Sequence, residues 1–236
     1  MNTTYYWLAM PALVMLFGGA LTFFWHPSKK LIALVQHLAV GIILAALMLE
    51  VFPEMRRTDV SQVTLIISFV IGVMFMYLVK LTGDYFERGN DVRSTQKQFN
   101  YGLILTVFID AALDGITIGA GFAAGQKVGF ALALGLSVEM LFLAMSLISD
   151  SIKGFRILLL STSLSLTILI SAVLSFRLLS ASSGSAIAIA LAFSAAALIY
   201  LVTEELLTEA HEHEEKSYSM LVLFAGFVLF WSISLL

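Results

Sequence analysis

The sequence has no cysteine, only three prolines and few charged residues. Charged side chains make up 12% of its 236 residues, where about 25% is typical of soluble domains. The lack of cysteine excludes disulfides, thiol catalysis and zinc sites built on thiolates. The low charge, with a net value of −3, argues against a disordered chain, a nucleic-acid-binding protein and an ordinary soluble enzyme.

Apolar residues, in contrast, account for 60% of the chain. A membrane-spanning helix needs about 20 mostly apolar residues. Eight stretches have this length, at residues 5–25, 30–52, 60–82, 99–124, 127–149, 155–177, 185–207 and 218–236. They fill most of the chain, so we expect an all-α integral membrane protein with one transmembrane domain over residues 1–236. The first 28 residues hold no Lys or Arg, so the first stretch is interpreted as a retained helix rather than a cleaved signal peptide.

The loops indicate how the chain is oriented, because cytoplasmic loops carry an excess of Lys and Arg. With the N-terminus outside, the inner loops and the adjoining ends of the stretches hold nine of these residues, and those on the outer side hold four. We therefore expect both termini outside and the longest loop, at residues 83–98, in the cytoplasm. The short loops and the lack of cysteine favour a bacterial inner membrane.

Three carboxylates lie within the apolar stretches. Asp110 and Asp114 belong to the fourth stretch and Glu139 to the fifth. Because positions four apart share a helix face, both aspartates project to the same side. The two stretches are joined by a tight link near residues 125–127, so all three side chains reach a similar depth near the midplane. A carboxylate at the bilayer centre costs about 2.5–3.5 kcal/mol on insertion scales, so its presence needs an explanation.

Three explanations are open. The acids are protonated or hydrogen-bonded to hydroxyl groups and act only as structural contacts. Alternatively, they share a divalent cation, for which oxygen ligands are suited. The third explanation is a proton relay that uses the same residues without a metal. Small-residue pairs, Gly115–Gly119 and Gly121–Gly125, predict close helix packing beside the aspartates.

Two acidic motifs lie near the ends of stretches. EVFPE begins at Glu50 and ELLTE begins at Glu205, with the same spacing of acids, Glu54 and Glu209 being the second ones. In the expected orientation the first is at the outer surface and the second at the inner one, as an inverted repeat would place them. A solvated helix end is the alternative for both. His37 is interpreted as a packed residue, and His211 with His213 as either a weak metal-attracting tract or part of a solvated acidic loop.

Taken together, these residues resemble the ZIP family of divalent metal transporters. The segment DAALDGITIG at 110–119 is similar to the family's fourth-span motif, His-Asn-x-Pro-Glu-Gly, with Asp110 at the motif's His and Asp114 at its Glu. Glu139 matches the opening ligand of the fifth-span motif. LEVFPE at 49–54 and EELLTEAH at 204–211 resemble the ends of the family's second and seventh spans.

This chain also departs from the family motifs. Ala111 and Leu113 replace the fourth-span Asn and Pro, and Leu143 stands where the fifth span has a second carboxylate. The resemblance therefore implies a single, oxygen-rich site rather than the two-metal site of many relatives. It also implies eight helices in a 3+2+3 inverted-repeat bundle, often as a homodimer.

The leading hypothesis is a transporter of zinc, iron, manganese or cadmium by alternating access. Its metal site would be formed by Asp110, Asp114 and Glu139, with Glu50 and Glu205 on the outer and inner approaches. The metal ion is the substrate, and no cofactor is expected. The alternatives are a ZIP-like sensor or interaction protein that does not transport, and a carrier of protons or another small solute. An enzyme is not expected, because no nucleophile–base pair or HExxH signature is present. The partners expected are the lipid bilayer and the divalent metal ion, with no nucleic acid.

Overall fold

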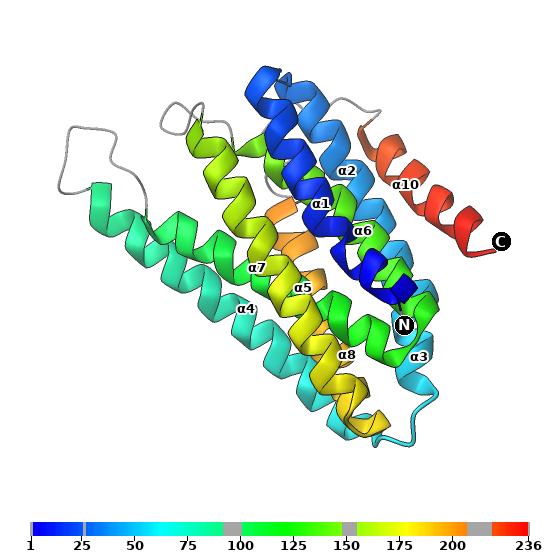
Figure 1. Cartoon of the computed structure of the whole chain (residues 1–236). Helices are drawn as coiled ribbons and strands as arrows, with labels where there is room; N and C mark the ends of the chain where they lie inside the picture. Colours follow the sequence, from blue (N-terminus) through cyan, green and yellow to red (C-terminus); the bar gives the residue numbers. More distant parts are fainter. Residues whose placement is uncertain (1, 26, 92–100, 148–154, 207–218, 236) are drawn as a thin grey trace.

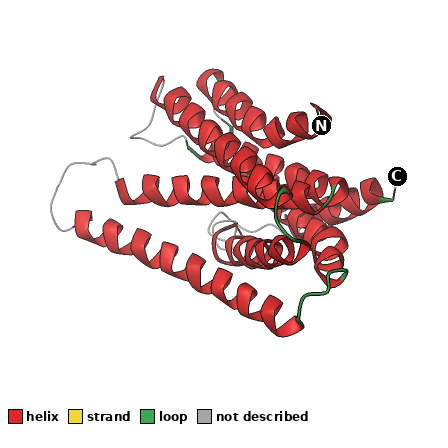
Figure 2. Ribbon diagram, turned by 60° about the horizontal axis from the view of Figure 1, so that its bottom comes forward, coloured by secondary structure: helices red, strands yellow, loops and turns green. Residues whose placement is uncertain are grey.

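The computed structural model describes residues 2–25, 27–91, 101–147, 155–206 and 219–235. Throughout these ranges the regular elements are helices and no strand is present, as Figure 2 shows. The expected all-α fold class is confirmed. In chain order the elements are α1 (Asn2–Phe24), α2 (Lys29–Ala46), η1 (Leu47–Val51), α3 (Phe52–Arg56), α4 (Gln62–Asp91), α5 (Tyr101–Ala124), α6 (Gln126–Ser146), α7 (Phe155–Ser180), α8 (Gly184–Leu201), η2 (Val202–Leu206) and α10 (Ser219–Ser234).

Seven helical segments are long and apolar enough to cross a membrane, which indicates an integral membrane protein. They correspond to the first seven expected stretches. The last apolar helix, α10, has 16 described residues, which at 1.5 Å per residue span about 24 Å of a hydrocarbon core about 30 Å thick. The eighth span therefore stays a prediction.

The helix of the third stretch is longer than its apolar part. The apolar segment ends at Gly83, close to the expected end of the stretch at residue 82, but α4 continues as a helix to Asp91 and so includes the first part of the expected loop over residues 83–98. Residues 83–91 contain no proline that would end the helix. A run of polar residues, which suggested a loop, is equally compatible with a helix whose end extends beyond the apolar layer.

The helices form a central group with one pair of helices on each side (Figure 1). In the central group, α1 contacts α6 and α7, and α5 contacts α6 and α7. The pair α2 and α10 packs against this group through α6, whereas the pair α4 and α8 packs against it through α5. The outer helices α4 and α10 lie at opposite edges in Figure 1 and expose much of their apolar surface.

Small residues bring α5 and α7 into direct backbone contact, as the Gly115–Gly119 spacing predicts. A Cβ atom on Gly115 would lie 2.5 Å from the carbonyl oxygen of Ile168, and one on Gly119 would lie 2.5 Å from that of Ala172. Ser175 adds a hydrogen bond of 2.9 Å from its hydroxyl group to the carbonyl oxygen of Ile116. These contacts hold α5 firmly next to α7 beside Asp114.

Two segments of the chain, 155 residues apart (183 − 28), have the same succession of elements. Ser28 caps α2 by accepting a hydrogen bond from the amide of Leu31, and Ser183 caps α8 in the same way through Ala186. Each helix has 18 residues and is followed by a five-residue π-helix, η1 or η2. In Figure 1, α2 and α8 run in opposite directions.

The packing of these two helices repeats with the same offset. Gly41 of α2 packs so closely on α10 that a Cβ would lie 2.9 Å from the amide nitrogen of Phe227. Gly72 of α4 packs on α8, where a Cβ would lie 2.9 Å from the Cβ of Ala196. Adding 155 to 41 and 72 gives 196 and 227, so the two contacts join corresponding positions.

Candidate functional site

Asp110 and Asp114 line a small cavity between three helices. The cavity has a volume of about 10 Å³, roughly the size that one water molecule or ion occupies. Asp114 is 3% exposed and an oxygen of each aspartate is shielded from solvent. The other lining residues are Leu113 and Thr117 of α5, Met76 of α4, and Ala197, Leu198 and Leu201 of α8. The prediction that both aspartates share a helix face is confirmed.

The cavity lies where the central group meets the pair α4 and α8. Asp110, Leu113, Asp114 and Thr117 follow the i, i+3, i+4, i+7 spacing of one helix face, and this face of α5 is turned toward α4 and α8. The adjacent face, with Gly115 and Gly119, packs on α7. One face of α5 therefore packs tightly on α7, and the adjacent face lines the acidic cavity.

The chemistry of the cavity is that of an oxygen-rich cation site. Its polar lining consists of two carboxylates and the hydroxyl group of Thr117, and its described lining residues include no Lys, Arg or His. Two carboxylates that line one cavity can share a divalent cation or a proton. The donor set suits a hard or borderline divalent ion.

Glu139 lies on α6 and does not line this cavity. It is 5% exposed. One turn before it, Gly135 packs on α2, where a Cβ would lie 3.2 Å from Cγ1 of Ile43. Measured from Gly125, Asp114 is 11 residues away (125 − 114), Glu139 is 14 (139 − 125) and Asp110 is 15 (125 − 110). Equal rise per residue puts the three carboxylates at similar depth.

The structure thus brings together the two aspartates and leaves Glu139 on a neighbouring helix at their level. Within the described ranges, no three His, Cys, Asp or Glu side chains are grouped closely enough to hold a metal ion. The site of three carboxylates stays a prediction.

Glu50 and Glu205 occupy the same place in the two π-helices, because each is the fourth residue of its element. Glu50 is partly buried. The side chain of Glu205 is outside the part of the structure that is described, as are Glu209, His211 and His213. Glu54 pairs with Arg57 on the surface at 3.2 Å, which agrees with a solvated helix end. π-Helical turns are rare in proteins, and those that occur are often found at functional sites.

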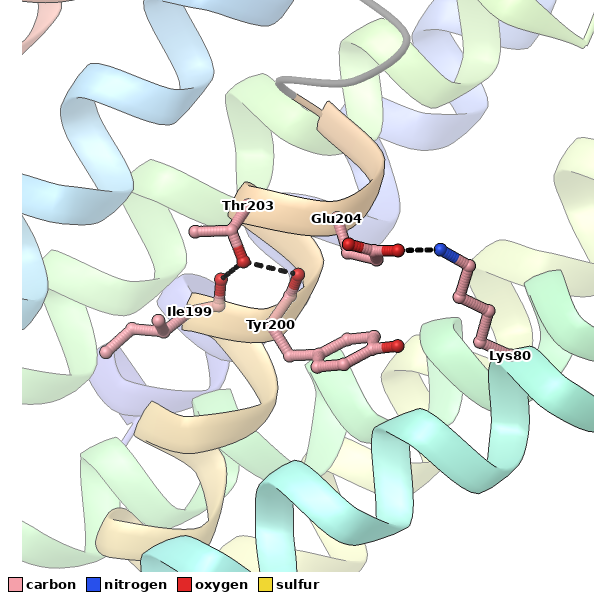
Figure 3. A network of polar contacts seen from close by, with 5 residues as sticks. All are labelled: Lys80, Ile199, Tyr200, Thr203 and Glu204. Atoms are coloured by element: carbon pink, nitrogen blue, oxygen red, sulfur yellow. Dashed lines mark hydrogen bonds and ion pairs between the residues drawn. The ribbon is translucent and has the colours of Figure 1, made fainter.

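Each π-helix has a local cause in the sequence. In η1 the amide of Phe52 bonds to the carbonyl oxygen of Leu47, five residues back, and the next residue, Pro53, has no amide hydrogen to continue an α-helical ladder. At η2 the hydroxyl group of Thr203 donates to the carbonyl oxygens of Ile199 and Tyr200 at 2.8 and 3.1 Å. Figure 3 shows this contact. Such side-chain bonds compete with the regular helix.

His37 is a packed residue, as expected. It is 1% exposed, and its Nδ1 lies 2.7 Å from the carbonyl oxygen of Ala33 in its own helix. Sequence reasoning missed the ion pair between Lys80 of α4 and Glu204 of η2, which Figure 3 shows. Lys80 is the only charged residue of the stretch 60–82, and this isolation was the available signal.

No protein-family model matches this sequence, and no curated protein matches it. The function must be inferred from the residues and their arrangement.

Proposed function

We propose that the protein is a divalent metal cation transporter that moves zinc, iron, manganese or cadmium across a membrane by alternating access. The observation that carries this proposal is the cavity lined by Asp110 and the buried Asp114 between apolar helices. Intramembrane carboxylates that face a cavity mark ion pathways in membrane proteins. The resemblance to the ZIP family motif at 110–119 supports the same assignment.

The position of the cavity suits alternating access. It lies between the central group, which contributes α5, and the pair α4 and α8. A displacement of α5 along α4 and α8 would carry the two aspartates toward one membrane surface or the other. The tight contact between α5 and α7 would make these two helices move together.

We propose further that α1, α2 and α4 form an inverted repeat of α7, α8 and α10, with α5 and α6 between them. The matching caps, π-helices and glycine contacts at an offset of 155 residues support this arrangement (183 − 28). Transporters commonly bind their substrates at the interface of such repeats. In this arrangement Glu50 and Glu205 would line the two approaches to the site.

The role of each acid follows from its position. Asp110 and Asp114 would bind the ion directly, with the Thr117 hydroxyl group as a further oxygen donor. Because bound metal displaces protons from carboxylates, binding and flux should weaken as the pH falls.

Uptake into proteoliposomes that contain the purified protein tests the proposal. We expect saturable flux of at least one of manganese(II), iron(II), zinc(II) and cadmium(II), and loss of this flux in Asp110→Asn and in Asp114→Asn. Asp59→Asn makes the same chemical change at an exposed position and should leave the flux unchanged. Absence of flux for all four metals with correctly folded protein would refute the proposal.

A carrier of protons is the second candidate. It is supported by the two carboxylates, Asp110 and Asp114, that line the cavity, because such groups can take up and release protons without a metal. This candidate predicts acidification of liposomes that is driven by a pH gradient, needs no divalent ion and is lost in Asp114→Asn.

A further inference from the structure

The ion pair between Lys80 and Glu204 joins α4 to the π-helix at the end of α8 (Figure 3). Both side chains are partly exposed, at 35% and 44%. In the same region, Thr203 of η2 bonds to the carbonyl oxygens of Ile199 and Tyr200 in α8. The pair is a polar link between α4 and η2.

This link lies directly beyond the acidic cavity. Lys80 follows Met76 by four residues and Glu204 follows Leu201 by three, and both Met76 and Leu201 line the cavity. Residues at these spacings lie on the same helix face, about one turn apart. A path from the aspartates along α4 and α8 toward the end of α8 would thus pass the ion pair first.

On the other side of the cavity, α4 and α8 are held together differently. Gly72 brings the backbones so close that a Cβ would lie 2.6 Å from the carbonyl oxygen of Phe193. The rings of Phe75 and Phe193 are also in contact, with centroids 5.7 Å apart. The two helices are therefore joined on one side of the cavity by backbone packing and a hydrogen bond from Ser68 to the carbonyl oxygen of Ile189, and on the other side by an ion pair.

The positions that correspond to Lys80 and Glu204 at the 155-residue offset are both apolar. Lys80 corresponds to Leu235 (80 + 155) and Glu204 to Leu49 (204 − 155). The pair is thus a feature of one end of the molecule only. A charge pair that the repeat does not require needs an explanation of its own.

We infer that the Lys80–Glu204 ion pair is the closure of the acidic cavity at the end where α8 passes into η2. While the pair is formed, η2 is held on α4 above Met76 and Leu201. A divalent cation that reaches Glu204 competes with the Lys80 ammonium group for the same carboxylate, so its arrival opens the closure. This inference rests on the proposed function for the identity of the ion that passes, and it assigns to Lys80 and Glu204 the control of access to that ion's site.

The lack of cysteine in the natural sequence makes a direct test possible. Leu201→Cys places a single thiol in the cavity wall, at a residue that is 5% exposed. Its rate of reaction with a water-soluble, membrane-impermeant maleimide is measured in vesicles of both protein orientations. The orientation that places the α8–η2 end on the outside reports access to the cavity from that end. We expect slow labelling in this variant and labelling about twofold to fivefold faster when Lys80→Gln or Glu204→Gln is added, the range expected for a partly exposed ion pair. The double exchange Lys80→Glu with Glu204→Lys should restore slow labelling.

A second reporter separates opening of the cavity from loosening of the whole protein. Ala133→Cys lies in α6 and is fully buried, so it should stay unlabelled with every Lys80 and Glu204 variant. Equal labelling of Leu201→Cys with and without the ion pair would overturn the inference. So would fast labelling in the double exchange, or labelling of Ala133→Cys whenever the pair is removed.

The labelling does not depend on transport. If the labelling is as expected but no metal flux is measured, the inference about the closure is supported and the proposed transport function is refuted. If metal flux is measured but the labelling rate is the same with and without the ion pair, the transport function is supported and the inference about the closure is refuted.

Discussion

Replacing Gly119 by alanine tests the contact that positions the acidic cavity. The new Cβ would lie 2.5 Å from the carbonyl oxygen of Ala172 and 2.7 Å from the amide nitrogen of Phe176. Both are backbone atoms, so no side chain can rotate away and α5 and α7 must separate. Overpacking of this kind costs about 1–3 kcal/mol, and a backbone clash belongs at the upper end. Alanine regains about 1 kcal/mol of helix propensity, which leaves a net destabilisation of about 2 kcal/mol.

Thermal unfolding of the purified protein in detergent measures this effect. A net loss of about 2 kcal/mol corresponds to a melting temperature lower by about 4–8 °C for a chain of this size. Gly184→Ala is the matched control, because no atom lies within 4 Å of the added Cβ, and its melting temperature should stay close to that of the natural protein. If Gly119→Ala were as stable as Gly184→Ala, the close approach of α5 and α7 would be refuted.

Further predictions concern the two related halves and the approaches to the site. Gly41→Ala and Gly72→Ala should lower the melting temperature by similar amounts, since each clashes with a neighbouring helix; a large effect of only one would contradict equivalent packing. Ser28→Ala and Ser183→Ala should each cost about 1 kcal/mol of unfolding free energy as lost N-caps, and an unchanged stability in denaturant titrations would contradict the capping bonds. Glu50→Gln should reduce metal uptake at low metal concentration more than at saturation, whereas an equal reduction at both would argue against a role in the approach.

Much of the fold could be predicted from the sequence, because the bilayer sets the length of its helices. The seven long spans follow from runs of apolar residues, and the shared face of Asp110 and Asp114 follows from helix geometry. The helical continuation of α4 to Asp91 was not predicted, since polar residues beyond the apolar layer are compatible with both a loop and a helix.

The features that were missed depend on contacts between distant segments. Nothing local to Lys80 identifies Glu204 as its partner, which lies 124 positions away. The residues of the cavity wall could not be identified from the sequence either. Met76 and Leu198 line the cavity only because α4 and α8 pack against α5, and nothing in the sequence distinguishes them from other apolar residues. The π-helices that contain Glu50 and Glu205 were also not predicted, although Pro53 and Thr203 are local causes that the sequence contains.

Metal-dependent stabilisation of the purified protein tests the central proposal most directly, because it measures binding at the cavity without requiring transport. A ligand at 100 times its dissociation constant stabilises a protein by about 2.7 kcal/mol, or about 5–10 °C in melting temperature for a chain of this size. We expect such a rise with at least one of manganese(II), iron(II), zinc(II) and cadmium(II), its loss in Asp114→Asn and its retention in Asp59→Asn. No rise with any of these metals, or an equal rise in Asp114→Asn, would contradict a cation site formed by Asp110 and Asp114.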